Sequence, residues 1–170
     1  MKTNILSAVF ILLLSFTAFA QTPESKPSPA ATATGKIGEA NITIEYSSPA
    51  VKGRKIWGDL VPYNQVWRAG ANEATIFTTD KDISVEGNKL PAGKYSLFAI
   101  PAEAEWTIIF NKVAKQWGAY KYTDKEDALR VRVKPREAKE QKERLAYTID
   151  PKKGFTLSWD KLDVLVLVSK

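Results

Sequence analysis

Apolar and polar residues alternate with a period of two through most of the chain that follows residue 35. The clearest case is L-R-V-R-V-K at residues 129–134, where Leu129, Val131 and Val133 should face a core and the basic residues solvent. Residues 162–168 are apolar on both faces, which is typical of a central strand. Further segments rich in β-branched and aromatic residues are predicted as strands: 41–46, 75–79, 94–100, 106–111, 145–149 and 155–159.

Turn sequences separate these predicted strands. E-G-N-K at residues 86–89 and D-P-K-K-G at residues 150–154 are typical of hairpins, and P-A-G at residues 91–93 predicts a turn before a strand. Residues 134–144 could be helical, but their charged run lacks an apolar stripe, so we expect an exposed loop or an extended strand end. The spacing predicts an all-β fold: a single antiparallel β-sandwich, jelly-roll-like or immunoglobulin-like, over residues 36–170.

The N-terminal residues have the pattern of a secretory signal peptide. Lys2 precedes an apolar stretch at residues 5–16, and A-F-A at residues 18–20 offers the small residues that signal peptidase reads. A membrane anchor is the alternative, but the stretch is shorter than the ~20 apolar residues that a spanning helix needs. We therefore expect a signal peptide at residues 1–20, cleavage before Gln21 and no membrane span afterwards.

Two further features define the expected mature protein. Residues 21–35 are rich in Pro, Ser, Thr and Ala, which predicts a disordered linker. The chain has no cysteine, so no lipoprotein anchor can form after the cleavage site and no disulfide can stabilise the fold. We expect a periplasmic or secreted protein that is held together by an ordinary hydrophobic core.

The net charge of +6 is concentrated in the second part of the chain. Residues 21–110 hold 9 basic and 10 acidic side chains, whereas residues 111–170 hold 15 basic and 9 acidic ones. A basic surface can attract nucleic acid, but an exported protein rarely meets it, so we expect no nucleic-acid partner. A solvated face rich in Lys and Arg is the simpler interpretation.

The residue types that are missing narrow the chemistry. The chain has no histidine and no cysteine, which removes Ser-His-Asp and Cys-His catalysis and the usual zinc ligands. It also has no glycine-rich phosphate loop of a standard spacing. We therefore predict no metal, no cofactor and no catalytic residue. A hydrolase that uses Asp59 and Glu73 stays open as an alternative, although Glu73 could instead form a structural ion pair with Arg68.

A block of aromatic and polar residues at positions 57–120 holds the candidate binding residues. Tryptophan and tyrosine rings can stack on sugars, while Asn, Glu and Arg bond hydroxyl groups. Tyr63, Trp67, Tyr120 and Tyr122 could contribute to stacking, with packing in the core as the competing interpretation. Trp106 and Trp159 lie in predicted strands and are expected in the core. The candidate ligand-binding residues, for a small molecule or a glycan, are Trp57, Arg68, Asn72, Glu73, Asn111 and Trp117.

Spaced motifs in this block resemble the DUF2911 family, a family of bacterial exported domains of unknown function. The resemblance covers residues 35–168 and implies an exported setting and a compact β-rich domain, without an assigned activity. The motifs are K-G-R-x-I-W-G (52–58), V-P-Y (61–63), V-W-R-A-G-A-N-E-A-T (66–75), L-P-A-G-K-Y-S-L-F (90–98), W-x-x-x-F-N-K (106–112) and Q-W-G (116–118).

Three hypotheses on function follow. The leading one is a non-catalytic ligand-binding module, with carbohydrate as one candidate ligand, or a cell-envelope module. The alternatives are a carboxylate-dependent hydrolase without histidine and a structural domain that binds a partner. A concave cleft lined by Trp57, Arg68, Asn72 and Glu73 would favour the ligand-binding module or the enzyme. Two carboxyl groups that face each other across it would favour the enzyme, and a flat apolar patch would favour the partner-binding domain.

Overall fold

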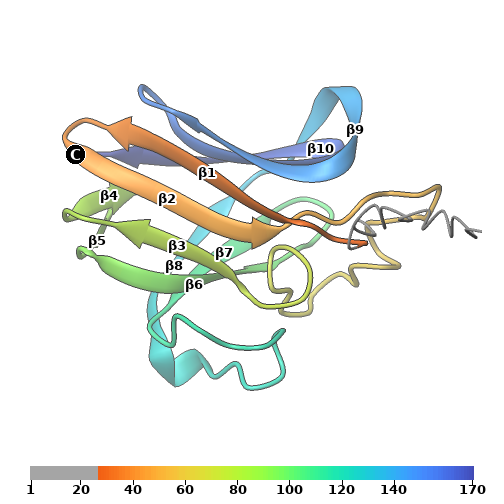
Figure 1. Cartoon of the computed structure of the whole chain (residues 1–170), viewed down its shortest axis with the longest axis horizontal. Helices are drawn as coiled ribbons and strands as arrows, with labels where there is room; N and C mark the ends of the chain where they lie inside the picture. Colours follow the sequence, from red (N-terminus) through yellow and green to blue (C-terminus); the bar gives the residue numbers. More distant parts are fainter. Residues whose placement is uncertain (1–26) are drawn as a thin grey trace, which may run out of the picture.

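Two antiparallel β-sheets form the computed structural model, which describes residues 27–170 of the chain (Figure 1). One sheet has six strands in the order β1-β2-β3-β6-β7-β8, and the other has four in the order β5-β4-β10-β9. The predicted all-β sandwich is confirmed. The elements are β1 (Ala30–Ile37), β2 (Ala40–Ser47), β3 (Thr75–Thr79), β4 (Ile83–Val85), β5 (Asn88–Leu90), β6 (Gly93–Ile100), β7 (Trp106–Asn111), the short 3-10 helix η1 (Asp124–Glu126), β8 (Asp127–Val133), β9 (Arg136–Asp150) and β10 (Gly154–Ser169).

The period-two pattern decides which side chains enter the core between the sheets. In β8, Val131 and Val133 are buried and Leu129 is half-buried, whereas Arg130 and Arg132 are exposed on the opposite face. This placement is the predicted one, because successive residues of a strand point to opposite faces of the sheet. In the part of the chain that the structure describes, no helix is long and apolar enough to cross a membrane.

The predicted disordered linker at residues 21–35 is wrong at its C-terminal end. Residues 30–35 belong to β1, which pairs with β2 from Ala30 opposite Ser47 to Ile37 opposite Ala40. Alternate residues of β1 are small and half-buried, and a Cβ on Gly35 would lie 2.7 Å from the Ile149 side chain. The alternation of alanine and threonine before Gly35 does fit a strand. It lacks the large apolar side chains by which strands are usually recognised in a sequence. The predicted signal peptide and the start of the linker lie outside the described residues.

A long hairpin of β9 and β10 covers the six-stranded sheet. The charged residues 136–144 form the first part of β9, so an extended strand is the correct one of the two expected conformations. Asp160, with a φ of 52°, bends β10 so that its end returns to its beginning. There the Val168 amide donates a hydrogen bond to the Lys153 carbonyl oxygen at 3.0 Å.

Four tryptophans fill one end of the core. Trp57 packs edge-on against Trp106 with a distance of 4.9 Å between ring centroids, and Trp67 stacks on Trp159 at 6.0 Å. All four rings are buried, as predicted for Trp106 and Trp159. The cluster joins the long connection at residues 48–74 to strands β7 and β10, and it thereby fixes the position of that connection.

Candidate functional site

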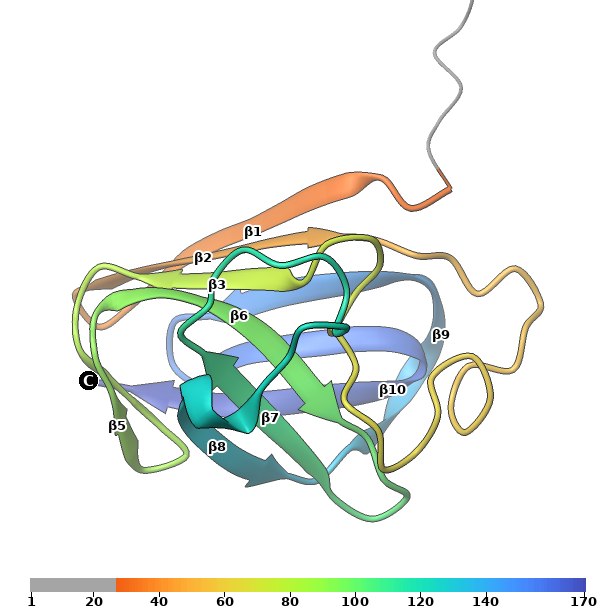
Figure 2. The ribbon, with the colours of Figure 1, turned by 90° about the horizontal axis from the view of Figure 1, so that it is seen from below.

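A hollow of about 260 Å³ opens beside this tryptophan cluster. Most of its wall comes from residues 48–74, the connection between β2 and β3, which loops out at one end of the sandwich (Figures 1 and 2). Trp67 and Trp159 of the buried cluster also line it. Other side chains that line it are those of Arg54, Leu60, Arg68 and Asn72.

Backbone hydrogen bonds position the segment that carries Arg68. The amide of Trp67 donates to the Ala99 carbonyl of β6 at 2.7 Å, and the Ala99 amide donates back to Trp67 at 2.9 Å. The indole N–H of Trp67 donates to the Gly70 carbonyl at 3.1 Å. Ala69 has a φ of 51°, and its carbonyl accepts hydrogen bonds from the Thr75 and Tyr147 hydroxyls. The turn after Arg68 is therefore rigid and holds the guanidinium at the hollow.

The charged groups in this hollow are both cations. The Arg54 guanidinium donates to the carbonyl oxygens of Ala50 and Val51, which fixes its position. The Nε of Arg68 is buried and has no hydrogen-bond partner among the described residues. No acidic side chain is among the described residues that line the hollow. Two arginine side chains without a carboxylate beside them leave an excess of positive charge in the hollow, which a ligand anion could neutralise.

Asn72 connects this hollow to a neighbouring loop. Its φ of 59° lies in the left-handed region, which asparagine tolerates better than most residues. Its side-chain amide donates to the Ser47 hydroxyl at 3.2 Å and to the Ser28 carbonyl at 3.4 Å. Its backbone carbonyl accepts from the Gly118 amide at 3.2 Å. Asn72 is thus tied to the backbone of two neighbouring segments.

The expected ion pair between Arg68 and Glu73 does not form in the described part of the chain. Arg68 lines the hollow beside the tryptophans, whereas Glu73 is exposed and lines a separate depression with Glu45 and Tyr46. The turn is closed without the carboxylate, because the Thr75 amide donates to the Arg68 carbonyl at 3.2 Å. The backbone of Glu73 pairs with that of Trp117. The ion-pair prediction is therefore wrong.

This arrangement makes Glu73→Gln a mild change. An exposed carboxylate that has no ion-pair partner should contribute less than ~0.5 kcal/mol to the free energy of unfolding. We expect the melting temperature of the variant to stay within about 2 °C of the parent in a thermal unfolding experiment. A loss of more than ~1 kcal/mol would show that the carboxylate has a structural partner after all.

The structure separates the other candidate residues. Trp57 lies in the tryptophan cluster, and its face is covered by neighbouring rings. Asn111 is fully buried, where its amide group donates to the Thr123 carbonyl and the Asp127 carboxylate. Asn111 therefore holds a loop in place. Trp117 is largely exposed on that loop. Of the six candidates, Arg68 and Asn72 line the same hollow.

Sequence reasoning missed two residues of this hollow. Arg54 lies in the K-G-R-x-I-W-G motif, which could have indicated it, because an arginine beside a core tryptophan needs a hydrogen-bonding role. Trp159 was expected in the core, and its ring is buried there and also lines the hollow. Trp159 lies in β10, far in sequence from the other residues of the hollow, so the sequence gave no indication that they are neighbours.

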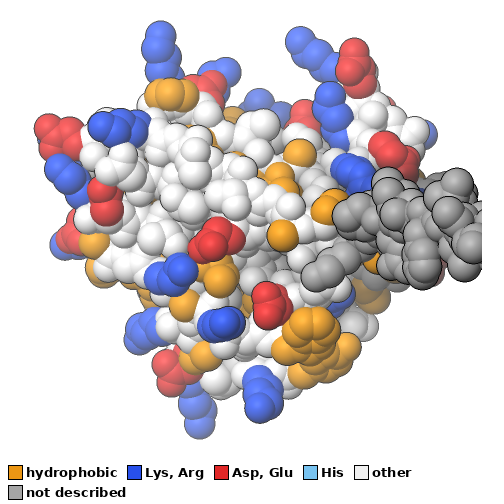
Figure 3. Space-filling model, viewed as in Figure 1, with side chains coloured by type: hydrophobic (Ala, Val, Ile, Leu, Met, Phe, Trp, Pro, Cys, Tyr) orange, Lys and Arg blue, Asp and Glu red, His pale blue; other side chains and the backbone are white. Residues whose placement is uncertain are grey.

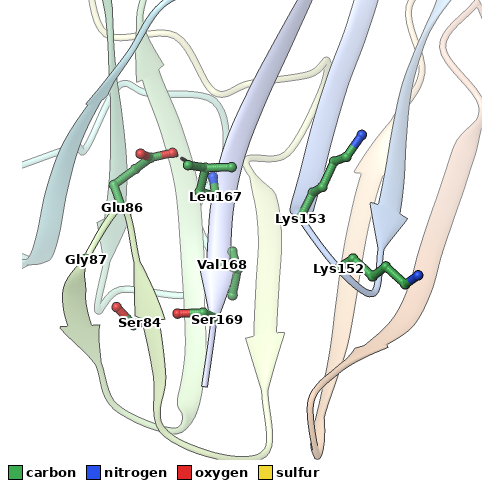
Figure 4. A pocket seen from close by; sticks show the side chains of 8 residues that line it. All are labelled: Ser84, Glu86, Gly87, Lys152, Lys153, Leu167, Val168 and Ser169. Atoms are coloured by element: carbon green, nitrogen blue, oxygen red, sulfur yellow. Dashed lines mark hydrogen bonds between the residues drawn. The ribbon is translucent and has the colours of Figure 1, made fainter.

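A larger hollow of about 350 Å³ lies at the opposite end of the sandwich, between the β4–β5 hairpin and the end of β10 (Figure 4). The Glu86 carboxylate accepts a hydrogen bond from the Leu167 amide at 2.6 Å, and it thus caps the strand edge. Lys152 and Lys153 point away from this carboxylate (Figure 4). The Glu86 carboxylate of this hollow is already used to bind the backbone of β10. None of the six candidate residues lines this hollow. Among the described residues, no cluster of acidic side chains could hold a metal ion.

Comparison with known proteins identifies the family. The family model described as "Protein of unknown function (DUF2911)" matches residues 28–168, which is most of the chain. The chain therefore belongs to the DUF2911 family, as its motifs suggested. No curated protein and no solved structure matches it.

Proposed function

We propose that this member of the DUF2911 family is an exported, non-catalytic binding domain that holds a small anionic ligand, such as an acidic sugar, against Arg68. Export rests on the predicted signal peptide at residues 1–20. The observation that carries the ligand class is the charge of the hollow: Arg54 and Arg68 both line it, and no acidic side chain is among its described lining residues.

A carboxylate is the group that best satisfies this site. A guanidinium and a carboxylate can form two parallel hydrogen bonds, which are stronger than bonds between neutral groups. Arg54 adds a second positive charge to the same hollow, and its hydrogen bonds to Ala50 and Val51 keep it in place. A site that is ordered before the ligand arrives loses little conformational entropy on binding.

The size and lining of the hollow favour a compact ligand that is recognised by charge. Its volume of about 260 Å³ is slightly below the ~300–1,000 Å³ of typical ligand pockets. Trp67 and Trp159 line it but are buried, so they offer little exposed ring surface for stacking on a sugar. Recognition of an acidic group is therefore better supported than recognition of a neutral sugar by its ring.

The ionisable side chains that line the hollow suit binding better than catalysis. Among the described lining residues these are two arginines, whose guanidinium groups carry hydrogen-bond donors and no acceptor. They offer positive charge but no proton transfer. The hydrolase alternative needs Asp59 and Glu73 at one site, yet Glu73 lines a separate depression.

A ligand titration tests this proposal. Glucuronate should raise the melting temperature of the full chain, and glucose should not, because only glucuronate brings a carboxylate to Arg68. Arg68→Gln should weaken glucuronate binding about 10- to 100-fold, since a hydrogen bond to a charged group contributes ~1.5–3 kcal/mol. Isothermal titration calorimetry measures the change in Kd.

Arg132→Gln is the matched control, because it removes an exposed arginine outside the hollow and should leave binding unchanged. The thermal unfolding of each variant without ligand shows that it folds. Equal binding of glucose and glucuronate, or equal Kd values for Arg68→Gln and Arg132→Gln, would contradict the proposal. So would a failure of glucuronate, acetate and phosphate alike to bind.

A further inference from the structure

The loop between β7 and β8 carries three large hydrophobic side chains that face solvent. Val113, Trp117 and Tyr120 have exposed fractions of 43%, 63% and 83%. The other large exposed hydrophobic side chains among the described residues, Leu60 and Leu167, lie on separate elements. Scattered exposed hydrophobic residues need no explanation, but a group on one loop marks an interaction surface.

The loop is held rigidly by two buried amides. The Gln116 side chain donates to the Asn111 side-chain oxygen at 3.2 Å and to the Val113 carbonyl at 2.9 Å. The same Asn111 oxygen accepts from the Val113 amide at 3.1 Å. The Ala74 amide donates to the Gln116 carbonyl, which ties the loop to the neighbouring connection. The exposed side chains are therefore presented on an ordered backbone.

The inner side of the loop packs against the six-stranded sheet through Tyr122, whereas Trp117 and Tyr120 on its outer side face solvent. Tyr122 packs against Phe98 of β6 with 5.1 Å between ring centroids, on the face of the six-stranded sheet away from β9 and β10 (Figure 2). Burial and a hydrogen bond to Asp127 raise the pKa of Tyr122 to about 12. Gly118, with a φ of 62°, leaves room for the Tyr120 ring, which a Cβ there would approach to 2.8 Å. Tyr120 and Trp117 are thus left on the solvent side.

Lysines outnumber acidic residues on the segment that carries these aromatic residues, although the exposed Glu73 is paired with Trp117 through the backbone. Four exposed lysines lie along residues 112–126, against the two acidic residues Asp124 and Glu126, so this segment has a net charge of +2. Figure 3 shows a hydrophobic group that stands out at the lower right of the molecule, with acidic as well as basic side chains near it. The four lysines are Lys112, Lys115, Lys121 and Lys125.

We propose that this loop docks the domain onto the surface of an anionic lipid bilayer. The rings of Trp117 and Tyr120 are amphipathic, and such rings are enriched at the level of the lipid headgroups. Lysines near an anionic surface add electrostatic attraction, and their long side chains keep the charge at the phosphates. The loop combines both components in one short segment. This inference is independent of the ligand proposed for the Arg68 hollow.

The polar groups of the loop favour a membrane over a glycan as the partner. A glycan site needs amides or carboxylates that converge on the sugar beside the stacking ring. Here the amides of Asn111 and Gln116 are turned inward and used within the loop. The exposed polar side chains are mostly lysines, which act as point charges, and Val113 adds an aliphatic side chain that cannot stack on a sugar ring.

Quenching of tryptophan fluorescence by brominated lipids tests the docking of the loop itself. The readout must be specific to the loop, because the apolar residues 5–16 of the full chain could bind lipid by themselves. Trp117 is exposed, whereas the other four tryptophans are buried in the core. We expect vesicles of brominated phosphatidylcholine mixed with phosphatidylglycerol to quench the full chain, and vesicles of brominated phosphatidylcholine alone to have little effect. Trp117→Phe should abolish most of the quenching.

Charge-reversal variants complete the experiment. The double variant Lys115→Glu/Lys121→Glu should lower the partition coefficient at least about tenfold, because attraction becomes repulsion at the surface. The control Lys152→Glu/Lys153→Glu changes the net charge equally in the β9–β10 turn and should have a much smaller effect.

Four results would overturn the proposal. They are an absence of quenching in both lipid mixtures, equal quenching in both, equal loss in the two double variants, and a change in Trp117 emission caused by a neutral oligosaccharide or by self-association of the chain.

Discussion

Replacing Trp106 by alanine is expected to lower the free energy of unfolding by about 3–5 kcal/mol, which is typical of truncating a buried tryptophan. Trp106 is fully buried in β7, and its ring contacts those of Trp57 and Trp67. Its removal leaves a cavity that the rigid sheets on either side can fill only in part. At about 4 °C per kcal/mol, the melting temperature should fall by roughly 12–20 °C.

The control for this prediction is the same substitution at an exposed position. Trp117→Ala removes the same atoms from the surface loop, so it should change the free energy of unfolding by less than ~0.5 kcal/mol. Thermal and urea unfolding of both variants measure the difference. Similar losses at the two positions would mean that the Trp117 ring is packed in the folded protein or that Trp106 is not.

Gly154→Ala is expected to be the second severe change, with a loss of at least about 3 kcal/mol. The φ of Gly154 is 132°, a region that only glycine adopts readily. A Cβ at this position would lie 2.1 Å from the Val166 carbonyl oxygen and 2.6 Å from the Val168 amide nitrogen. Both neighbours are backbone atoms of the bent strand β10, so the clash can be relieved only by moving that strand.

Gly87→Ala separates the two causes. Gly87 also has a positive φ, of 79°, but a Cβ there would meet no other atom within 4 Å. Its substitution should cost about 1 kcal/mol, from backbone strain alone. Urea unfolding of the two variants gives the comparison. If Gly154→Ala lowers the free energy of unfolding no more than Gly87→Ala does, the close contact between Gly154 and the backbone of residues 166–168 is incorrect.

The strands were predictable because their signal is local. Alternation of Leu129, Val131 and Val133 with charged residues defines the buried face of β8 without knowledge of its partner. Strand β1 was missed because its half-buried positions are alanine and glycine, which fit against Ile149 of β9 but carry no hydrophobic signal of their own. The need for a small residue at position 35 comes from its contact with Ile149, which lies more than a hundred residues away in the sequence.

The candidate site was only partly predictable. Arg68 and Asn72 lie in one motif, and both line the hollow that the structure contains. The ion pair between Arg68 and Glu73 was wrong because proximity in sequence does not determine side-chain direction. The backbone turns between them at Ala69 and Asn72, both of which have positive φ. The two charges therefore reach different depressions on the surface.

The sequence by itself determined the β-rich class, the positions of most strands and the family. Each of these depends on local alternation or on motifs that are read in order along the chain. The tertiary structure alone decided which tryptophans outside the strands are buried: Trp57 and Trp117 belong to one aromatic block, yet one is in the core and the other faces solvent. Burial of a loop residue depends on which distant element covers it. β10 brings Trp159 over Trp57, whereas among the described residues nothing comparable covers Trp117.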